Sequence, residues 1–347
     1  MKLRFMEQPV LNPALMSCPT CQEEQRIGIH SRAERRYRCH ACGCTFAETQ
    51  GTAFFGLHYP IWVVVLVATL LAHGCPVAAL VAAFFLDERT VLAWQRKASR
   101  QAQQVQATMS QQHPVELGQV QADELCVTTQ LGKVWVATAV SVFSRLFLGG
   151  AVSAQRDHRL IDRLMECLYQ VAAGIPQAVL FAVDGLSLYP KAILTRFYTK
   201  VYTGPPGRPP HQPWPDLHIV QVVKSRCGRK LKEVTRNLVH GSLNAAYALI
   251  AATQVEWGLI NTAYIERFNG TLRARIATLV RRTRSLARTV ARLEADLYWT
   301  GIVYNFCTVH DSLEGTPAMA VEWTDHVWSV LELLWFRPPP SKLHAIV

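Results

Sequence analysis

The stretch AVLFAVDGLSLY, residues 178–189, decides the fold class. Its first half is an almost continuous apolar run, and Asp184 and Gly185 close it. A short apolar run bounded by turn residues is typical of a strand that is covered on both faces, as in a sheet flanked by helices. An acidic side chain after such a strand is costly to bury unless metal or hydrogen bonds compensate it, so Asp184 is a candidate functional residue.

The sequence on either side supplies the expected neighbours of this strand. Residues 117–154 contain three β-rich runs separated by turn residues, and apolar side chains recur at helical spacing over 157–174. Three strands, a helix and a buried strand predict an α/β domain, which we bound at 118–310. Six prolines in 204–215 predict an irregular loop, and strand-like alternation with a basic face resumes over 218–242.

An arginine-rich segment follows. Eight arginines and no acid lie between Arg267 and Arg292, and Glu266 precedes them alone. Apolar side chains recur every three or four residues from Ile265 to Leu279, which predicts one helix with a single buried stripe. Without these eight arginines, 28 of the 36 Lys and Arg residues would remain against 25 acidic residues. Most of the net charge of +11 therefore lies in this segment. A concentrated cationic stripe favours a polyanionic partner, with nucleic acid ahead of a membrane surface.

Five of the ten cysteines lie in the first 44 residues. The pairs Cys18/Cys21 and Cys39/Cys42 form two C-x-x-C motifs with seventeen residues between them, which is typical of a zinc ribbon. A redox dithiol pair is the alternative. No signal-peptide pattern is visible, so a reducing cytoplasm is the expected setting, where clustered cysteines more often bind metal. We therefore expect Zn²⁺ in a ribbon over 1–56.

Residues 57–99 are expected to form a helical module. Three short helices are predicted over 61–73, 77–85 and 88–98, and two apolar helices before a more polar one match a helix-turn-helix unit. A plain three-helix bundle, or a protein interface in place of a DNA reader, is the alternative. The polar, glutamine-rich segment 100–117 is expected to be an extended or helical linker.

A membrane segment is a further alternative for this module. The stretch 61–86 contains no lysine, arginine or acid and is long enough to span a bilayer. His73 to Pro76, however, divides it into two pieces that are each too short to cross. We therefore expect that the protein does not span a membrane.

Three carboxylates occupy places from which the backbone can direct side chains into one cleft: Asp123 in the first β-rich run, Asp184 after the buried strand, and Glu266 near the start of the basic helix. Convergent carboxylates suit two Mg²⁺ or Mn²⁺ ions about 3.5–4 Å apart, which activate an attacking oxygen and stabilise a leaving one. Glu124 is a rival to Asp123, but strand alternation is expected to point it to the opposite face. Taken singly, each acid could instead be an exposed or salt-bridged residue, a turn former or a helix-dipole partner.

Over nearly its whole length the chain resembles bacterial insertion-sequence transposases with a DDE active site, most closely the insertion-sequence-one-like group. The resemblance lies in CPTC…CHACG, QADEL, DGLSLYPKAI, NTAYIERFNGTLR, TVHDSLEGTPAMA and TDHVWSVLELL. It implies a ribonuclease-H-like catalytic domain with Asp123, Asp184 and Glu266 as the metal-binding triad. Arg273 matches the basic residue that follows the glutamate by seven positions.

The sequence thus predicts a DNA transposase that cleaves transposon ends and transfers strands into target DNA. Double-stranded DNA is the expected partner of a dimer or larger assembly in the bacterial cytoplasm, and 311–347 is a helical tail. A non-catalytic DNA-binding regulator and a nuclease on the same fold are the alternatives. The residues expected to contact DNA are Arg267, Asn269, Arg273, Arg275, Arg281, Arg282, Lys224, Arg226 and Arg229.

Overall fold

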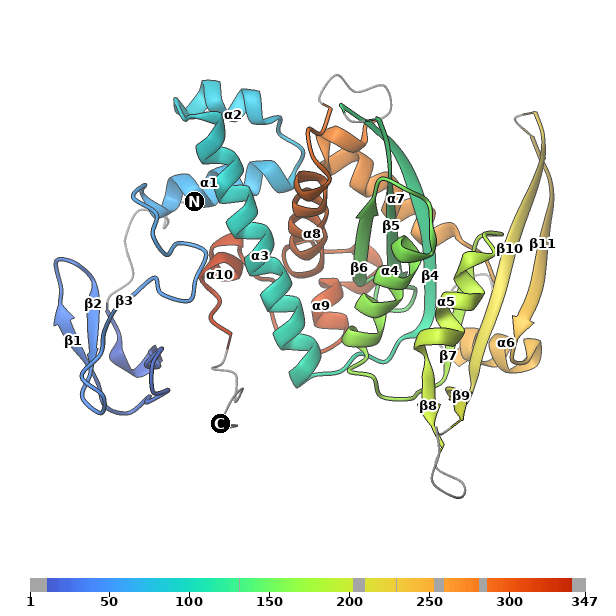
Figure 1. Cartoon of the computed structure of the whole chain (residues 1–347), viewed down its shortest axis with the longest axis horizontal. Helices are drawn as coiled ribbons and strands as arrows, with labels where there is room; N and C mark the ends of the chain where they lie inside the picture. The colour runs from blue at the N-terminus through green and yellow to red at the C-terminus, as the bar shows by residue number, and fades with distance from the viewer. Residues whose placement is uncertain are drawn as a thin grey trace.

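A six-stranded mixed sheet organises the chain, with strand order β11-β10-β7-β4-β5-β6 (Figure 1). The computed structural model describes residues 11–130, 132–201, 210–228, 230–252, 259–280 and 286–338, without the side chain of Arg226. The strands of this sheet are β4 (Gly118–Thr129), β5 (Gly132–Ser141), β6 (Phe147–Ser153), β7 (Val179–Val183), β10 (Leu217–Cys227) and β11 (Lys230–His240). The first three pair antiparallel, β7 pairs parallel with both β4 and β10, and β11 returns antiparallel along β10. The mixed α/β class predicted from the sequence is confirmed.

Helices cover both faces of the sheet. They are α4 (His158–Val171), α5 (Leu188–Arg196), α6 (Leu243–Ala252), α7 (Ala263–Arg275) and α8 (Val290–Cys307). Two adjacent glycines of β6 show that α4 and α8 lie on opposite faces. A Cβ atom at Gly149 would lie 2.7 Å from Cys167 of α4, and one at Gly150 would lie 2.6 Å from Leu297 of α8. Every residue of β7 is buried, as expected for a strand covered on both sides.

The arginine-rich segment is not one helix, contrary to the prediction. Its apolar positions from Ile265 to Leu279 are buried, but α7 ends at Arg275 and Ile276 is extended. A 3-10 turn, η3 (Ala277–Leu279), follows, and α8 begins only at Val290. The end of α7 meets the turn between α1 and α2, where a Cβ atom at Gly74 would lie 2.9 Å from the Ala274 carbonyl oxygen. The buried stripe therefore continues through a bend.

The helical module contains α1 (Ile61–Ala72), α2 (Val77–Phe84) and α3 (Glu88–Gln112). The first two agree with the expected helices, but α3 continues far past residue 98. Of the extended and helical forms expected for 100–117, the helical one is observed up to Gln112, and this part of α3 is packed, because Ala102, Val105 and Met109 recur at helical spacing and are buried. The polar composition of 100–117 concealed this packed stripe.

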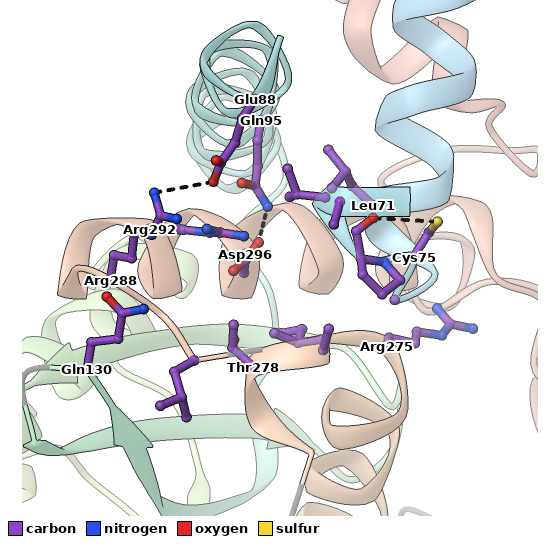
Figure 2. A pocket seen from close by; sticks show the side chains of 17 residues that line it. Leu71, Cys75, Glu88, Gln95, Gln130, Arg275, Thr278, Arg288, Arg292 and Asp296 are labelled. Atoms are coloured by element: carbon purple, nitrogen blue, oxygen red, sulfur yellow. Dashed lines mark hydrogen bonds and ion pairs between the residues drawn. The ribbon is translucent and has the colours of Figure 1, made fainter. Parts of the chain in front are cut away.

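The helical module shares an interface with the sheet domain along α3 and α8 (Figure 1). A cavity of about 220 Å³ lies at this junction, and Figure 2 shows Gln95 and Asp296 pointing into it. The Gln95 side-chain amide donates a hydrogen bond to Asp296, and the Trp299 indole donates to the Ala68 carbonyl at 2.8 Å. Burial raises the pKa of Asp296 to about 7 against the attraction of Arg292.

The N-terminal sheet comprises β1 (Ile27–Ser31), β2 (Arg36–Cys39) and β3 (Thr45–Ala47) in that order. Tyr37 and Phe46 form its small core, with ring centroids 5.8 Å apart. The Ala53 amide donates to the Leu334 carbonyl at 3.1 Å, which ties the chain leaving this sheet to α10 (Val330–Trp335).

Short elements complete the chain: η2 (Pro13–Leu15), β8 (Tyr198–Lys200), β9 (His211–Pro213), η4 (Asp311–Leu313) and α9 (Pro317–Ala320). Half of the expected proline-rich loop, residues 204–209, lies outside the described ranges, and β9 in its other half pairs with β8. Among the described helices, none has both the length and the apolar character needed to cross a bilayer.

Candidate metal centre

The carboxyl end of β7 is where the acidic residues meet. In the parallel pairing of β4 with β7, Ala122 lies opposite Val183, and the next residues along the two strands are Asp123 and Asp184. Carboxylate oxygens of Asp123, Glu124 and Asp184 all lie within 4.8 Å of one another. The end of a parallel strand in an open α/β sheet is a usual place for ligand binding. The structure thus brings together two of the three predicted carboxylates and adds a third that was not predicted.

Asp123 is held from the α7 side of the sheet. The Asn269 side-chain amide donates to its Oδ2 at 3.0 Å, and the Glu124 backbone amide donates to its Oδ1 at 2.8 Å. Burial raises the pKa of Asp123, and the nearby Asp184 and Glu266 carboxylates also raise it, although both hydrogen bonds act in the opposite direction. Asp123 therefore lies in a buried environment that disfavours its charged form.

Glu124 was expected to point to the opposite face from Asp123, yet its carboxylate lies within 4.8 Å of those of Asp123 and Asp184. Alternation does send its side chain to the other side of β4 from Asp123, toward Arg156, whose Nη2 lies 3.0 Å from Oε2. Because β7 ends at Val183, no neighbouring strand lies between the Asp123 and Glu124 side chains on that edge of β4. Their carboxylate oxygens therefore come close to each other. The Glu124 side chain is fully buried, and its Oε1 has no hydrogen-bond partner among the described residues. Burial, together with Asp184, raises its pKa to about 7.

Asp184 is fixed by its own turn and by a neighbouring strand. Its Oδ1 accepts a hydrogen bond from the Leu186 amide at 2.9 Å. The Gln221 side chain of β10 donates to the carbonyls of Asp184 and Leu186, at 3.3 and 3.1 Å. Arg156 also reaches Asp184, at 3.4 Å, so one guanidinium bridges two of the three clustered carboxylates.

Glu266 stands beside this cluster but is not one of the three. Its carboxylate forms an ion pair with Lys224 of β10, and the Thr262 hydroxyl donates to it at 2.8 Å. It is close enough to raise the pKa of Asp123. The predicted triad is thus gathered in one region, with its third member paired to a lysine rather than in contact with the two aspartates.

The start of α7 is positioned by Gln121, a residue that sequence reasoning missed. Its buried Oε1 accepts from the amides of Tyr264 and Ile265 at 2.9 and 3.0 Å, which caps the helix from β4. The signal was present as a glutamine two positions before Asp123 in a β run. Asn261 also contributes at this end, because its Oδ1 accepts from the Ala263 amide at 2.9 Å. Gln121 and Asn261 together fix the start of α7 and hence the position of Glu266 in its first turn.

The residues expected to contact DNA have different environments. Arg267 is exposed on α7, and Arg273 is half-buried further along it. Arg275 donates to the Thr308 hydroxyl at 2.9 Å, and Lys224 is paired with Glu266. Asn269 is 1% exposed and bound to Asp123, so it holds a carboxylate and cannot contact DNA directly. Arg229, Arg281, Arg282 and the Arg226 side chain lie outside the described residues.

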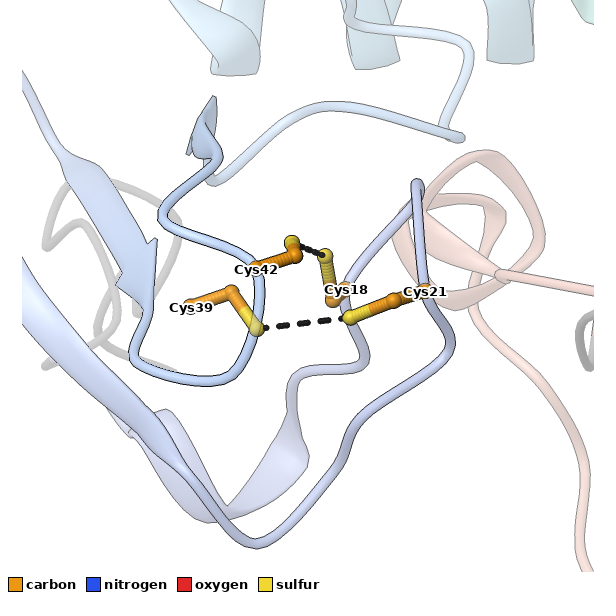
Figure 3. A group of neighbouring side chains, drawn as sticks. All are labelled: Cys18, Cys21, Cys39 and Cys42. Atoms are coloured by element: carbon orange, nitrogen blue, oxygen red, sulfur yellow. Dashed lines mark hydrogen bonds between the residues drawn. The ribbon is translucent and has the colours of Figure 1, made fainter.

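The four motif cysteines converge as predicted (Figure 3). Cys18 and Cys42 have their sulfurs 3.6 Å apart, and those of Cys21 and Cys39 are 3.5 Å apart. Thiolates around one tetrahedral zinc at about 2.3 Å would be separated by roughly 3.8 Å. All four are free thiols whose ligand atoms lie within 4.8 Å of one another. The cluster therefore fits a single Zn²⁺ ion.

Comparison with known proteins does not change this description. A scan against protein-family models gives no match for the chain, and a search of curated proteins gives none.

Proposed function

We propose that the chain is a DDE-type DNA transposase, in which the carboxylates at the end of β7 bind divalent cations for phosphodiester cleavage and strand transfer. The observation that carries the proposal is the convergence of Asp123, Glu124 and Asp184 within 4.8 Å, with Glu266 beside them. Close carboxylates raise one another's pKa unless a cation compensates, and hard oxygen ligands suit Mg²⁺ or Mn²⁺.

The hydrogen bonds and ion pairs of these carboxylates indicate whether the site suits a cation. Glu124 Oε1 is buried without a partner among the described residues, and Arg156 places a positive charge between Glu124 and Asp184. A buried unpaired carboxylate oxygen is costly, so the site favours a positive ligand. When bound, divalent metal at such a site polarises the scissile phosphodiester and lowers the pKa of attacking water.

The chain's own residues prepare the site for DNA. Asn269 and the Glu124 amide orient Asp123, and Gln221 holds the turn that carries Asp184. Lys224 lies at the edge beside Glu266, where a DNA phosphate could replace the carboxylate as its partner. Arg267, one residue further along α7, is exposed and adds positive charge to the surface of this helix. Such contacts position a backbone without reading its sequence.

The sheet order supports the ribonuclease-H-like assignment within this proposal. An antiparallel three-strand meander, β4 to β6, is followed by the parallel strands β7 and β10, with Asp184 at the carboxyl end of β7 and Asp123 on the neighbouring β4. The four-cysteine cluster supports a zinc ribbon, since its sulfur spacing matches tetrahedral coordination. The ribbon and helical module are the candidates for recognising DNA ends.

The decisive experiment compares the wild-type chain with Asp184→Asn on duplexes that carry the element's own ends. Joined products that require Mg²⁺ and vanish in the variant, while DNA binding persists, would establish transposition. Cleavage without joining would favour the nuclease alternative. Binding without cleavage in both proteins would overturn the enzymatic proposal and favour a regulator.

A further inference from the structure

A second polar pocket lies on the other side of α7 from Asn269. It encloses about 60 Å³, and its lining includes Arg145, Tyr264, Arg267, Tyr304 and His310. The volume admits a small oxyanion but not a nucleoside. Arg267 is exposed on α7, which places the mouth of the pocket at the protein surface. None of the carboxylates of the metal centre lines it.

Two buried nitrogen atoms in this lining have no hydrogen-bond partner within the described part of the chain. One is Nη1 of Arg145 and the other is Nε2 of His310. The other amino group of Arg145 lies 3.5 Å from the Tyr264 hydroxyl, and the guanidinium carbon lies 4.1 Å from the centroid of that ring. Stacking thus fixes the guanidinium while leaving one N–H group unsatisfied. A buried donor without an acceptor is costly, which points to a bound group that supplies oxygen atoms.

The charge around the pocket is positive. The guanidinium groups of Arg145, Arg275 and Arg267 all lie close enough to oppose the burial that raises the pKa of Tyr304 to about 12. None of these three arginines forms an ion pair with a described acid. Burial lowers the pKa of His310, and the charges of Arg275 and Arg145 lower it further, while the neighbouring Asp311 acts in the opposite direction. Several guanidinium groups against one exposed carboxylate favour an anion over a cation.

Arg145 also has a backbone conformation that side chains rarely adopt. Its φ of 58° lies in the left-handed region, in the turn that joins β5 to β6. Strained residues of this kind concentrate at ligand-binding positions, where surrounding contacts hold them. Here the ring of Tyr264 supplies such a contact.

We propose that this pocket binds a single phosphate group through Arg145, Arg267 and His310, and that the phosphate belongs to a DNA backbone. The assignment to DNA rests on the proposed function, because a free phosphate ion presents the same oxygens. Arg267 of this pocket and Glu266 are neighbouring residues of α7. A duplex that contacts α7 through this pocket would therefore lie next to the metal centre. Planar, fixed guanidinium donors suit phosphate oxygens.

The first arm of the test measures inorganic phosphate binding to the full chain by calorimetry, without added divalent metal and at constant ionic strength. Wild type should bind saturably, and Arg145→Gln should bind at least about tenfold more weakly, since a charge-assisted contact is lost. Arg267→Gln is the second variant, because an exposed helical arginine can be changed without affecting the fold. Arg159→Gln, at an exposed position of α4, is the matched control and should bind as wild type.

The second arm measures duplex affinity across a salt series, again without added divalent metal. If the phosphate is part of DNA, Arg145→Gln should reduce the slope of log affinity against log salt by about 1, and phosphate should compete with the duplex. Lost phosphate binding with unchanged DNA affinity would overturn the DNA source and leave a site for a free oxyanion. Equal phosphate binding by wild type and both pocket variants would overturn the site itself. Neither arm needs metal or cleavage, so failure here is distinct from failure of the proposed function.

Discussion

Asn269 holds Asp123 in place: its amide donates to Asp123 Oδ2 at 3.0 Å while its own oxygen accepts from Thr138 at 2.9 Å. Both bonds join α7 to the sheet, so the helix that carries Glu266 and the strand that carries Asp123 are fixed relative to each other. We expect Asn269→Ala to destabilise the protein by about 1–3 kcal/mol, because it leaves buried polar groups unpaired. Chemical denaturation measures this loss, and Mn²⁺ titration should show weaker metal binding in the folded variant.

Gly270 is the matched control on the next position of α7. It is exposed and helical, and a Cβ atom there would meet nothing within 4 Å. Gly270→Ala should therefore stabilise the protein by about 0.5–1 kcal/mol through helix propensity, with unchanged Mn²⁺ affinity. Destabilisation by this variant would mean that the side of α7 next to the site is more crowded than its geometry indicates.

The observed carboxylate cluster contains Glu124, whereas the triad that the resemblance implies contains Glu266 in its place. Glu124→Gln keeps the size of the side chain and its contact with Arg156, but it removes the charge from a buried oxygen that has no described partner. We expect Mn²⁺ affinity to fall about tenfold or more, measured by calorimetry or electron paramagnetic resonance. Loss of affinity in Glu266→Gln alone, with Glu124→Gln unchanged, would contradict the cluster and favour the triad.

The zinc proposal predicts one bound Zn²⁺ ion per chain, measured by mass spectrometry or a colorimetric chelator. Cys39→Ser should lose the metal and unfold the N-terminal sheet, because metal binding supplies much of the folding free energy of so small a unit. Cys44 is the matched control: it is half-buried and accepts a hydrogen bond from Thr20 at 3.2 Å, outside the four-sulfur group. Retention of zinc by Cys39→Ser would contradict tetrahedral four-cysteine coordination.

The sequence was informative where a local pattern has a single structural solution. The apolar run before Asp184 predicted a covered strand, and the two C-x-x-C pairs predicted a shared metal site; β7 is buried throughout and the four cysteines converge. Periodicity identified the buried positions of the arginine-rich segment but not its bend, because the bend at Ile276 depends on contact with the distant turn at Gly74.

The errors at the metal centre have the same origin. Alternation gave the correct direction for Glu124, yet its distance from Asp184 depends on where β7 ends, which is a property of the pairing. Gln121 and Arg156 could not be selected for the same reason. A glutamine or arginine gains its role from a partner that lies far away in sequence.

Asp296 predicts how stability depends on pH. Its pKa rises from 3.8 to about 7 because the carboxyl is buried between α3 and α8, with Gln95 as its donor (Figure 2). Between about pH 4 and 7 the unfolded chain would ionise this group while the folded chain keeps it protonated. The folded state therefore binds more protons, and this residue's contribution to stability is lost as pH rises through that window.

Asp296→Asn removes the titration but keeps an acceptor for Gln95. At pH 8 the variant should be more stable than wild type by about 2–4 kcal/mol, because a shift of about three pKa units corresponds to roughly 4 kcal/mol and the adjoining cavity admits water. Near pH 4 the two proteins should have equal stability. Denaturation curves at both pH values measure the difference. A constant difference across pH would show that Asp296 is ionised in the folded protein and compensated by Arg292, which lies in the same cavity.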